Sequence, residues 1–132
     1  MRLFGLDEAR KFVPHLLEVF GRVRDWLDEA RQRAILLENK DVPREERLRL
    51  EAEISAYATR IRDELAKVEE AGIEIKAVDG LIDFRATLED RQVYLCWKYP
   101  EDTVAYWHEL GDGFAGRQLI QEGQHFRPSF VS

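Results

Sequence analysis

The sequence has almost no cysteine and no long hydrophobic run. Its 132 residues include a single cysteine, Cys96, which has no partner for an internal disulfide. Nowhere do about eighteen apolar residues follow one another, as a membrane-spanning helix would require. Residues 3–8 reach an acidic pair without an apolar run, so we expect no secretory signal. These absences predict a protein of the reducing cytoplasm that has no membrane partner.

An excess of positive charge is also missing. The chain has 20 lysines and arginines against 26 aspartates and glutamates, which gives a formal net charge of −6. A general nucleic-acid binder needs a cationic surface that releases counterions from phosphates. The basic residues of the run 44–49 alternate with acids, which is typical of a solvated helix face. We therefore expect no nucleic-acid partner.

The first quarter of the chain carries a helical pattern. Apolar residues between positions 9 and 37 recur at alternating spacings of four and three, which indicates a helix packed along a neighbour. Pro14 interrupts this pattern, and proline fits the first turn of a helix better than its interior. The sequence therefore predicts a short lead-in helix over 7–12 and a main helix that begins near Pro14.

A second helical pattern follows after a short break at residues 39–43. Its apolar positions run from Leu50 to Val68, Asp41 is the expected N-terminal cap, and Gly72 is suited to end the helix. A connection of about five residues makes two helices antiparallel neighbours. We expect a helical hairpin over residues 7–72.

The pattern then changes to the alternation typical of strands. Residues 73–77 and 93–99 alternate apolar and polar side chains, 81–87 is a plausible strand between them, and 104–108 is either a fourth strand or a helical turn. Asp79-Gly80 is a tight-turn signal between the first two segments.

These patterns define a fold class. We predict a single α+β domain over 1–132: a long antiparallel helical hairpin followed by a small antiparallel β-meander of three or four strands. The β-rich unit spans 73–120, and residues 121–132 are expected to form a loosely held tail.

Four strings of the last third resemble a known family. LIDF (81–84), VYLCW (93–97), YWHEL (106–110) and GFAGRQ (113–118) closely resemble the bacterial family catalogued as domain of unknown function 2203, and the helical half is similar in length. Leu119 stands where that family is associated with proline. The resemblance implies a bacterial-type cytoplasmic protein, and it implies no activity, cofactor or site because the family is uncharacterised.

The candidate site residues are ionisable side chains inside otherwise apolar, aromatic segments. They are Asp83, His108, Glu109, Asp112 and Arg117. Histidine beside carboxylates is suited to proton transfer near neutral pH. The structural alternative is that His108 hydrogen-bonds Asp83 while Arg117 pairs with Asp112, which would form a polar corner of the sheet.

The sequence contains only weak evidence for a metal site or for a catalytic nucleophile. His108 and Glu109 are adjacent and lack the spacing of four residues that places two ligands on one helix face. Cys96 has no second thiol, and within a strand it is expected to behave as a small buried hydrophobe. The sequence thus predicts no metal site and no cofactor-binding residue, and it leaves any cofactor unknown.

The glycine-rich loop 111–117 has two interpretations. Its backbone N–H groups and Arg117 are suited to bind a phosphate or carboxylate. Alternatively, the glycines form turns around Phe114, which anchors the loop in the core.

The helical stripes suggest a partner. Apolar residues including Phe20, Trp26, Leu36 and Tyr57 form stripes wider than one neighbouring helix can cover. The leading functional hypothesis is therefore a cytoplasmic scaffold or interaction protein that forms a homodimer or higher homo-oligomer. The alternative is a small-molecule enzyme or binding protein with a polar site between the sheet and loop 111–117.

Overall fold

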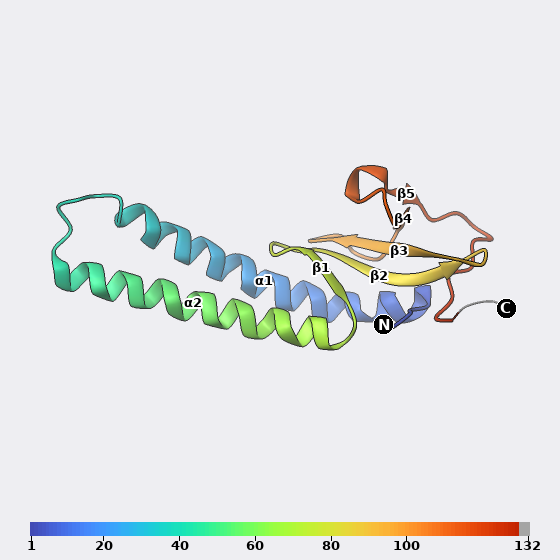
Figure 1. Ribbon diagram of the computed structural model, residues 1–132, viewed down its shortest axis with the longest axis horizontal. Helices are drawn as coiled ribbons and strands as arrows, with labels where there is room; N and C mark the ends of the chain where they lie inside the picture. The colour runs from blue at the N-terminus through green and yellow to red at the C-terminus, as the bar shows by residue number, and fades with distance from the viewer. Residues whose placement is uncertain (130–132) are drawn as a thin grey trace.

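Two long helices precede a five-stranded antiparallel sheet in the computed structural model, which describes residues 1–129 (Figure 1). The strands lie in chain order, so the predicted hairpin and β-meander are confirmed, with one strand more than expected. Within residues 1–129, neither helix is long and apolar enough to cross a membrane. The elements are α1 Leu6–Leu36, α2 Arg44–Glu70, β1 Glu74–Ala77, β2 Leu81–Leu88, β3 Arg91–Lys98, β4 Tyr106–Glu109, the 3₁₀ turn η1 Phe114–Gly116 and β5 Gln118–Leu119.

Helix α1 runs through Pro14 without a break, so the predicted lead-in helix over 7–12 is wrong. The buried face of α1 continues on both sides of the proline, with Ala9 and Val13 before it and Leu16 after it. Pro14 itself lies on the exposed face, where water can hydrate the carbonyl that loses its helical hydrogen bond. Packing of the buried face therefore outweighs the local preference of proline.

Helix α2 begins and ends at backbone features supplied by Pro43 and Gly72. Pro43 is the N-cap, and no side chain caps the helix, so the expected cap at Asp41 is wrong. Asp41 instead donates its backbone N–H to Asn39 Oδ1 at 2.9 Å. Gly72 adopts a left-handed φ of 89°, as predicted, and a Cβ there would lie 2.7 Å from Arg2 Cβ.

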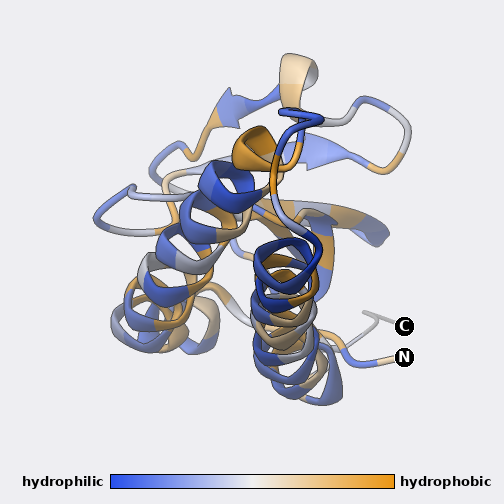
Figure 2. Ribbon diagram, turned by 90° about the vertical axis from the view of Figure 1, so that its left-hand side faces the viewer, coloured by the Kyte–Doolittle hydropathy of each residue, from blue (hydrophilic) through white to orange (hydrophobic). Residues whose placement is uncertain are grey.

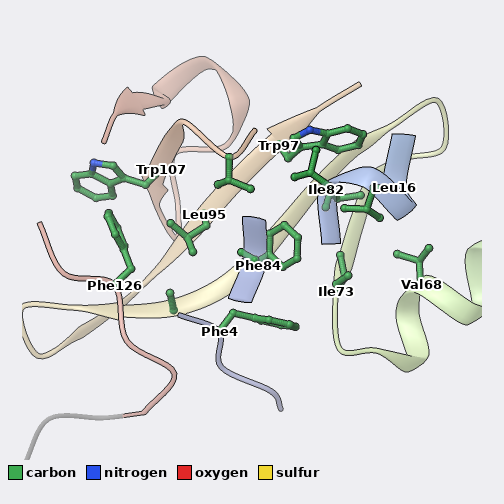
Figure 3. Close-up of a cluster of buried hydrophobic side chains, with 14 of the residues drawn as sticks. Phe4, Leu16, Val68, Ile73, Ile82, Phe84, Leu95, Trp97, Trp107 and Phe126 are labelled. Carbon is green, nitrogen blue, oxygen red and sulfur yellow. The ribbon is translucent and has the colours of Figure 1, made fainter. Parts of the chain in front are cut away.

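The core lies between the first half of α1 and one face of the sheet (Figure 3). Alternate residues of the strands point to this face because successive side chains of a strand point to opposite sides. Trp97 and Phe84 are fully buried there, and Phe4 joins them by donating its backbone N–H to the Arg85 carbonyl at 2.7 Å.

The hairpin extends well beyond the sheet (Figure 1), and its outer sides are mostly hydrophilic in the view along it (Figure 2). All buried residues of α1 lie between Ala9 and Val23. Phe20 is fully buried, so its assignment to an uncovered stripe is wrong: the sheet covers it, and its ring lies 6.1 Å from that of Trp97. Leu36 is about half exposed, which agrees with its assignment to an apolar stripe that the neighbouring helix does not cover.

The segment after β5 packs against the sheet, so a loosely held tail is the wrong description of this part of the chain. Arg127 and Thr87 exchange two backbone hydrogen bonds of 2.9 Å. Phe126 is buried, with its ring 6.2 Å from that of Trp107 (Figure 3). An apolar side chain anchored on the core fixes a segment that has no strand pattern of its own. Residues 130–132 of the predicted tail lie outside the described residues.

Candidate functional site

The sheet face opposite the helices carries a cluster of three buried polar side chains. Asp83 on β2 pairs directly with Cys96 on β3, and His108 on β4 pairs with Tyr94, two residues before Cys96. Alternation sends these side chains away from the core, toward the side on which η1 lies (Figure 1). Asp83, Cys96 and His108 are each at most 2% exposed.

The potential ligand atoms of these three residues converge. One carboxylate oxygen of Asp83, the Sγ of Cys96 and a ring nitrogen of His108 all lie within 4.8 Å of one another. His108 Nε2 lies 3.2 Å from Asp83 Oδ1 and 3.1 Å from Oδ2, so the predicted hydrogen bond between these two residues is present. We refer to Asp83, Cys96 and His108 as the DCH cluster.

The backbone fixes the tautomer of His108. Its Nδ1 lies 2.7 Å from the carbonyl oxygen of Glu109. A carbonyl only accepts hydrogen bonds, so Nδ1 must carry its hydrogen. The hydrogen bond between Nε2 and Asp83 then requires one more proton, held by the imidazole or by the carboxyl group. In either case, Nε2 is directed into the DCH cluster.

The DCH cluster forms the floor of a cavity of about 250 Å³. Residues of the loop after β4 line its mouth, among them Leu110, Gly111, Gly113 and Phe114. Leu110 is 44% and Phe114 is 43% exposed. Phe114 therefore does not anchor the loop in the core, and that interpretation of the glycine-rich segment is wrong.

The geometry argues against an activated cysteine nucleophile. Burial, followed by the neighbouring Asp83 carboxylate, raises the pKa of the Cys96 thiol to about 12. Burial also raises the pKa of the Asp83 carboxyl group, against the opposing effect of His108. A catalytic cysteine needs a base that accepts its proton and an environment that favours the thiolate. Here Nε2 of His108 faces Asp83, and the surroundings favour the neutral thiol.

Glu109 and Arg117 form ion pairs with residues outside the DCH cluster, although Arg117 lies close enough to oppose the rise in the pKa of the Cys96 thiol, and Asp112 lies apart from the cluster. Glu109 pairs with Arg91 at 2.7 Å on the surface. Arg117 pairs with Glu101 through two hydrogen bonds of 3.0 and 2.9 Å, so the expected pair with Asp112 is wrong. Asp112 is exposed in the loop and does not line the cavity.

Arg117 has a supporting role beside the cavity. Its guanidinium carbon lies 3.9 Å from the ring centroid of Tyr106 and 4.4 Å from that of Phe114. Its side chain is 13% exposed, while that of its partner Glu101 is 26% exposed. Arg117 therefore connects the loop to the outer face of the sheet by stacking and by a bidentate ion pair.

Replacing Arg117 with alanine is expected to lower the free energy of unfolding by about 1–3 kcal/mol. Removing one partner of a fully buried ion pair would lower the free energy of unfolding further, but water reaches Glu101 and hydrates the carboxylate that is left. Urea denaturation of Arg117→Ala measures the loss. Arg91→Ala is the matched control, because its pair with Glu109 is more exposed and should cost under about 1 kcal/mol. Equal losses in the two variants would contradict the assignment.

Cys96 is the site residue that sequence reasoning missed. In the sequence no second thiol accompanies Cys96, and its neighbours Leu95 and Trp97 are apolar, so the pattern predicts a buried structural residue. The available signal was strand alternation: Val93, Leu95 and Trp97 share one face, which places Cys96 on the other. The register with Asp83 was still needed to bring the two residues together.

Fold and site together define a small α+β protein whose meander sheet carries a helical hairpin on one face and a buried Asp–Cys–His cluster on the other. The chain belongs to the family described as uncharacterized conserved protein DUF2203, whose model matches residues 2–120. The family resemblance of the four strings is therefore confirmed. No curated protein and no solved structure matches the chain.

Proposed function

We propose that this protein binds a small amphipathic molecule in the cavity above the DCH cluster. The observation that carries the proposal is that Asp83 and His108, although each is only 2% exposed, line a cavity beside the loop residues Gly111 and Gly113. A cavity with a few convergent polar groups and partly apolar walls is the usual form of a ligand site. The volume of about 250 Å³ suits a ligand smaller than a typical drug molecule.

The lining indicates which end of the ligand points inward. The floor offers the remaining acceptor capacity of the Asp83 carboxyl group and the weak donor of the Cys96 thiol, so it favours a polar group that exchanges hydrogen bonds. At the mouth, Leu110 and Phe114 expose apolar surface that a ligand would cover. The ligand therefore places a polar head group on the floor and a short hydrocarbon part against the loop.

Volume alone does not identify this site. A larger hollow of about 610 Å³ lies between the N-terminus, the end of α2 and β1. Most of its charged residues are already paired: Arg2 pairs with Glu8, and Lys76 pairs with Glu74 within the hollow itself. The smaller cavity is favoured because buried groups converge on its floor.

A cytoplasmic location is part of the proposal and is supported by the single free cysteine.

The proposal predicts that shortening the apolar side chains at the mouth weakens ligand binding about tenfold, since part of the buried hydrocarbon contact is lost. The probes are hexanoate, hexylamine and hexanol, which differ only in head group. Chemical shifts of the Gly111 and Gly113 amides report binding to the ¹⁵N-labelled chain. We expect saturable shifts for at least one probe, and weaker binding in the double variant Leu110→Ala/Phe114→Ala.

The matched control is Leu119→Ala. Leu119 is 57% exposed on nearby β5 and does not line the cavity, so this variant should bind as the wild type does. If none of the three probes shifts the two glycine amides, the proposal fails. Equal weakening in the control would show nonspecific contact with apolar surface and would also contradict it.

Self-association of the hairpin is the second candidate function, and an apolar groove on α2 supports it. The groove has a volume of about 570 Å³. Arg62 and Glu69 lie along it, on either side of Leu65 and Ala66. If a second copy packs there antiparallel, with the two-fold axis near Leu65 and Ala66, each Arg62 faces the Glu69 of the other copy. The groove is lined by Leu27, Ala58, Ile61, Arg62, Leu65, Ala66, Glu69 and Val78.

Light scattering of charge-reversal variants tests this second candidate. Arg62→Glu and Glu69→Arg should each weaken the dimer, because each places like charges opposite one another, and the double variant should restore it. Both positions are exposed, so folding should be unaffected. A monomeric wild type at micromolar concentration would end the hypothesis, and a dimer insensitive to both reversals would exclude this interface.

A further inference from the structure

The DCH cluster has the composition and geometry of a metal centre. It offers one carboxylate oxygen, one sulfur and one imidazole nitrogen from three adjacent strands, with these atoms within 4.8 Å of one another. We propose that Asp83, Cys96 and His108 bind one Zn²⁺ ion and leave a fourth coordination position open to the cavity. This inference deepens the proposed function, because it concerns the floor of the same pocket.

The distances suit a tetrahedral ion. Zn²⁺ binds nitrogen and oxygen at about 2.0–2.2 Å and sulfur at about 2.3 Å, which separates ligand atoms in a tetrahedral site by about 3.3–3.7 Å. His108 Nε2 and the Asp83 oxygens are 3.1–3.2 Å apart, slightly closer than that. A charge-assisted hydrogen bond would be shorter still, at about 2.7–2.9 Å. The spacing of this pair therefore lies between that of a tight ion pair and that of two ligands of one metal ion. The Cys96 sulfur lies within 4.8 Å of both atoms, which is the range from which it can close onto the same ion.

The orientation of His108 supports metal binding. A metal-binding histidine usually donates its second ring N–H to a carbonyl or carboxylate, which orients the other nitrogen toward the ion. The hydrogen bond from Nδ1 to the Glu109 carbonyl provides this support. Nε2 is then the ligand atom, and it is directed toward Asp83.

Charge balance also favours the replacement of two protons by one Zn²⁺ ion in the DCH cluster. Without metal, the buried cluster holds a neutral thiol and one proton shared by Asp83 and His108. Binding of Zn²⁺ releases both protons to solvent, leaving a thiolate, a carboxylate and a neutral imidazole around the ion. Two positive charges leave and two enter, so the net charge of the buried cluster is unchanged. That avoids the large cost of adding a net charge to a site shielded from water.

The ligand set identifies the class of metal. Sulfur and imidazole ligands disfavour Mg²⁺ and Ca²⁺, which prefer oxygen atoms, whereas mixed nitrogen, oxygen and sulfur sites suit Zn²⁺. Three protein ligands with a fourth position facing a cavity are typical of catalytic zinc sites, while structural sites use four protein ligands. An open position toward Gly111 and Gly113 would place the polar head group of a bound molecule on the ion.

Metal titration of the full chain tests the proposal. The chain is freed of metal by dialysis against a chelator and titrated with Zn²⁺ in competition with a fluorescent indicator. Co²⁺ then replaces Zn²⁺ for absorption spectroscopy. We expect one ion per chain, d–d bands of a four-coordinate ion and a thiolate-to-cobalt charge-transfer band. Cys96 is the only cysteine, so that band reports it directly.

Cys96→Ser and His108→Gln should each weaken Zn²⁺ binding at least about a hundredfold, in line with the loss of a direct ligand. His125→Gln is the matched control, because His125 is exposed and distant from the DCH cluster in the chain; it should bind as the wild type does. Circular dichroism of the metal-free variants checks folding, and the near-isosteric Cys96→Ser carries the test if His108→Gln does not fold.

The proposal is overturned if the wild type binds no Zn²⁺ above the level of the Cys96→Ser variant, or if the cobalt form has no charge-transfer band. Loss of binding in His125→Gln would show a different site and would also overturn it. The hexyl probes separate the two proposals. If the wild type binds a probe but no Zn²⁺, the zinc proposal fails and the ligand pocket stands. If it binds Zn²⁺ but no probe, the zinc proposal stands and the ligand pocket fails.

Discussion

Replacing Trp97 with alanine is expected to lower the free energy of unfolding by about 3–5 kcal/mol. Trp97 is fully buried on β3, the central strand of the sheet, and is the largest of the fully buried side chains. Its ring lies 6.1 Å from that of Phe20 on α1, so it joins the sheet to the hairpin. Its Nε1–H also donates a hydrogen bond of 2.8 Å to the Glu101 carbonyl. The truncation thus leaves a cavity and an unsatisfied carbonyl.

Equilibrium urea denaturation followed by circular dichroism measures this effect. Trp97→Phe should lose less, because a ring still fills part of the space. Trp26→Ala is the matched control: Trp26 is only partly buried on α1, so its loss should be clearly smaller. Similar losses for Trp97 and Trp26 would contradict the assignment of Trp97 to the centre of the core.

In the metal-free protein, native Cys96 is expected to react with a thiol reagent at least about a thousandfold more slowly than the same residue in the denatured chain. Thiolate is the reactive form, and the pKa of the native thiol is raised to about 12. At about pH 8, a rise of roughly three units from the ordinary value lowers the thiolate fraction about a thousandfold. Cys96 is also 1% exposed on the central strand, so access slows the reaction further.

Labelling with Ellman's reagent measures both rates. The denatured chain is the internal control, because it contains the same single thiol. The reaction should accelerate as pH rises toward the raised pKa. Rapid labelling of the folded protein would show that Cys96 is accessible, and it would contradict the position assigned to it beneath the cavity.

The two halves of the fold were predictable because each has one dominant periodicity. The spacing of four and three over 9–37 indicated a helix packed along one face, and the alternation over 93–99 indicated a strand. All but the last residue of each range lie in α1 and β3, respectively. The predictions that were wrong rested on local sequence preferences, which tertiary packing overrides. Pro14 remains inside α1 because buried residues continue on both sides, and Phe126 holds a segment that has no pattern of its own.

The candidate site was only partly predictable. Asp83 and His108 stood out as ionisable residues within aromatic segments, and they are in contact. Glu109 and Arg117 stood out for the same reason, yet each forms an ion pair outside the DCH cluster. Composition of a segment identifies residues that need partners, but it does not identify the partner. Arg117 pairs with Glu101 instead of Asp112, and Glu101 is positioned by a turn over residues 98–101, where its backbone N–H donates to the Lys98 carbonyl.

The sequence by itself determined the helical hairpin, the meander and the family, because these depend on residue spacing along the chain. Only the tertiary structure decided that Asp83, Cys96 and His108 meet. They are separated by 13 and 12 positions and come from three strands, so their contact depends on strand register. A shift of one residue in either pairing would turn a strand's side chains to the other face, and the cluster would not exist. Register is set by burial of the opposite, apolar face, which is a property of the packed sheet as a whole.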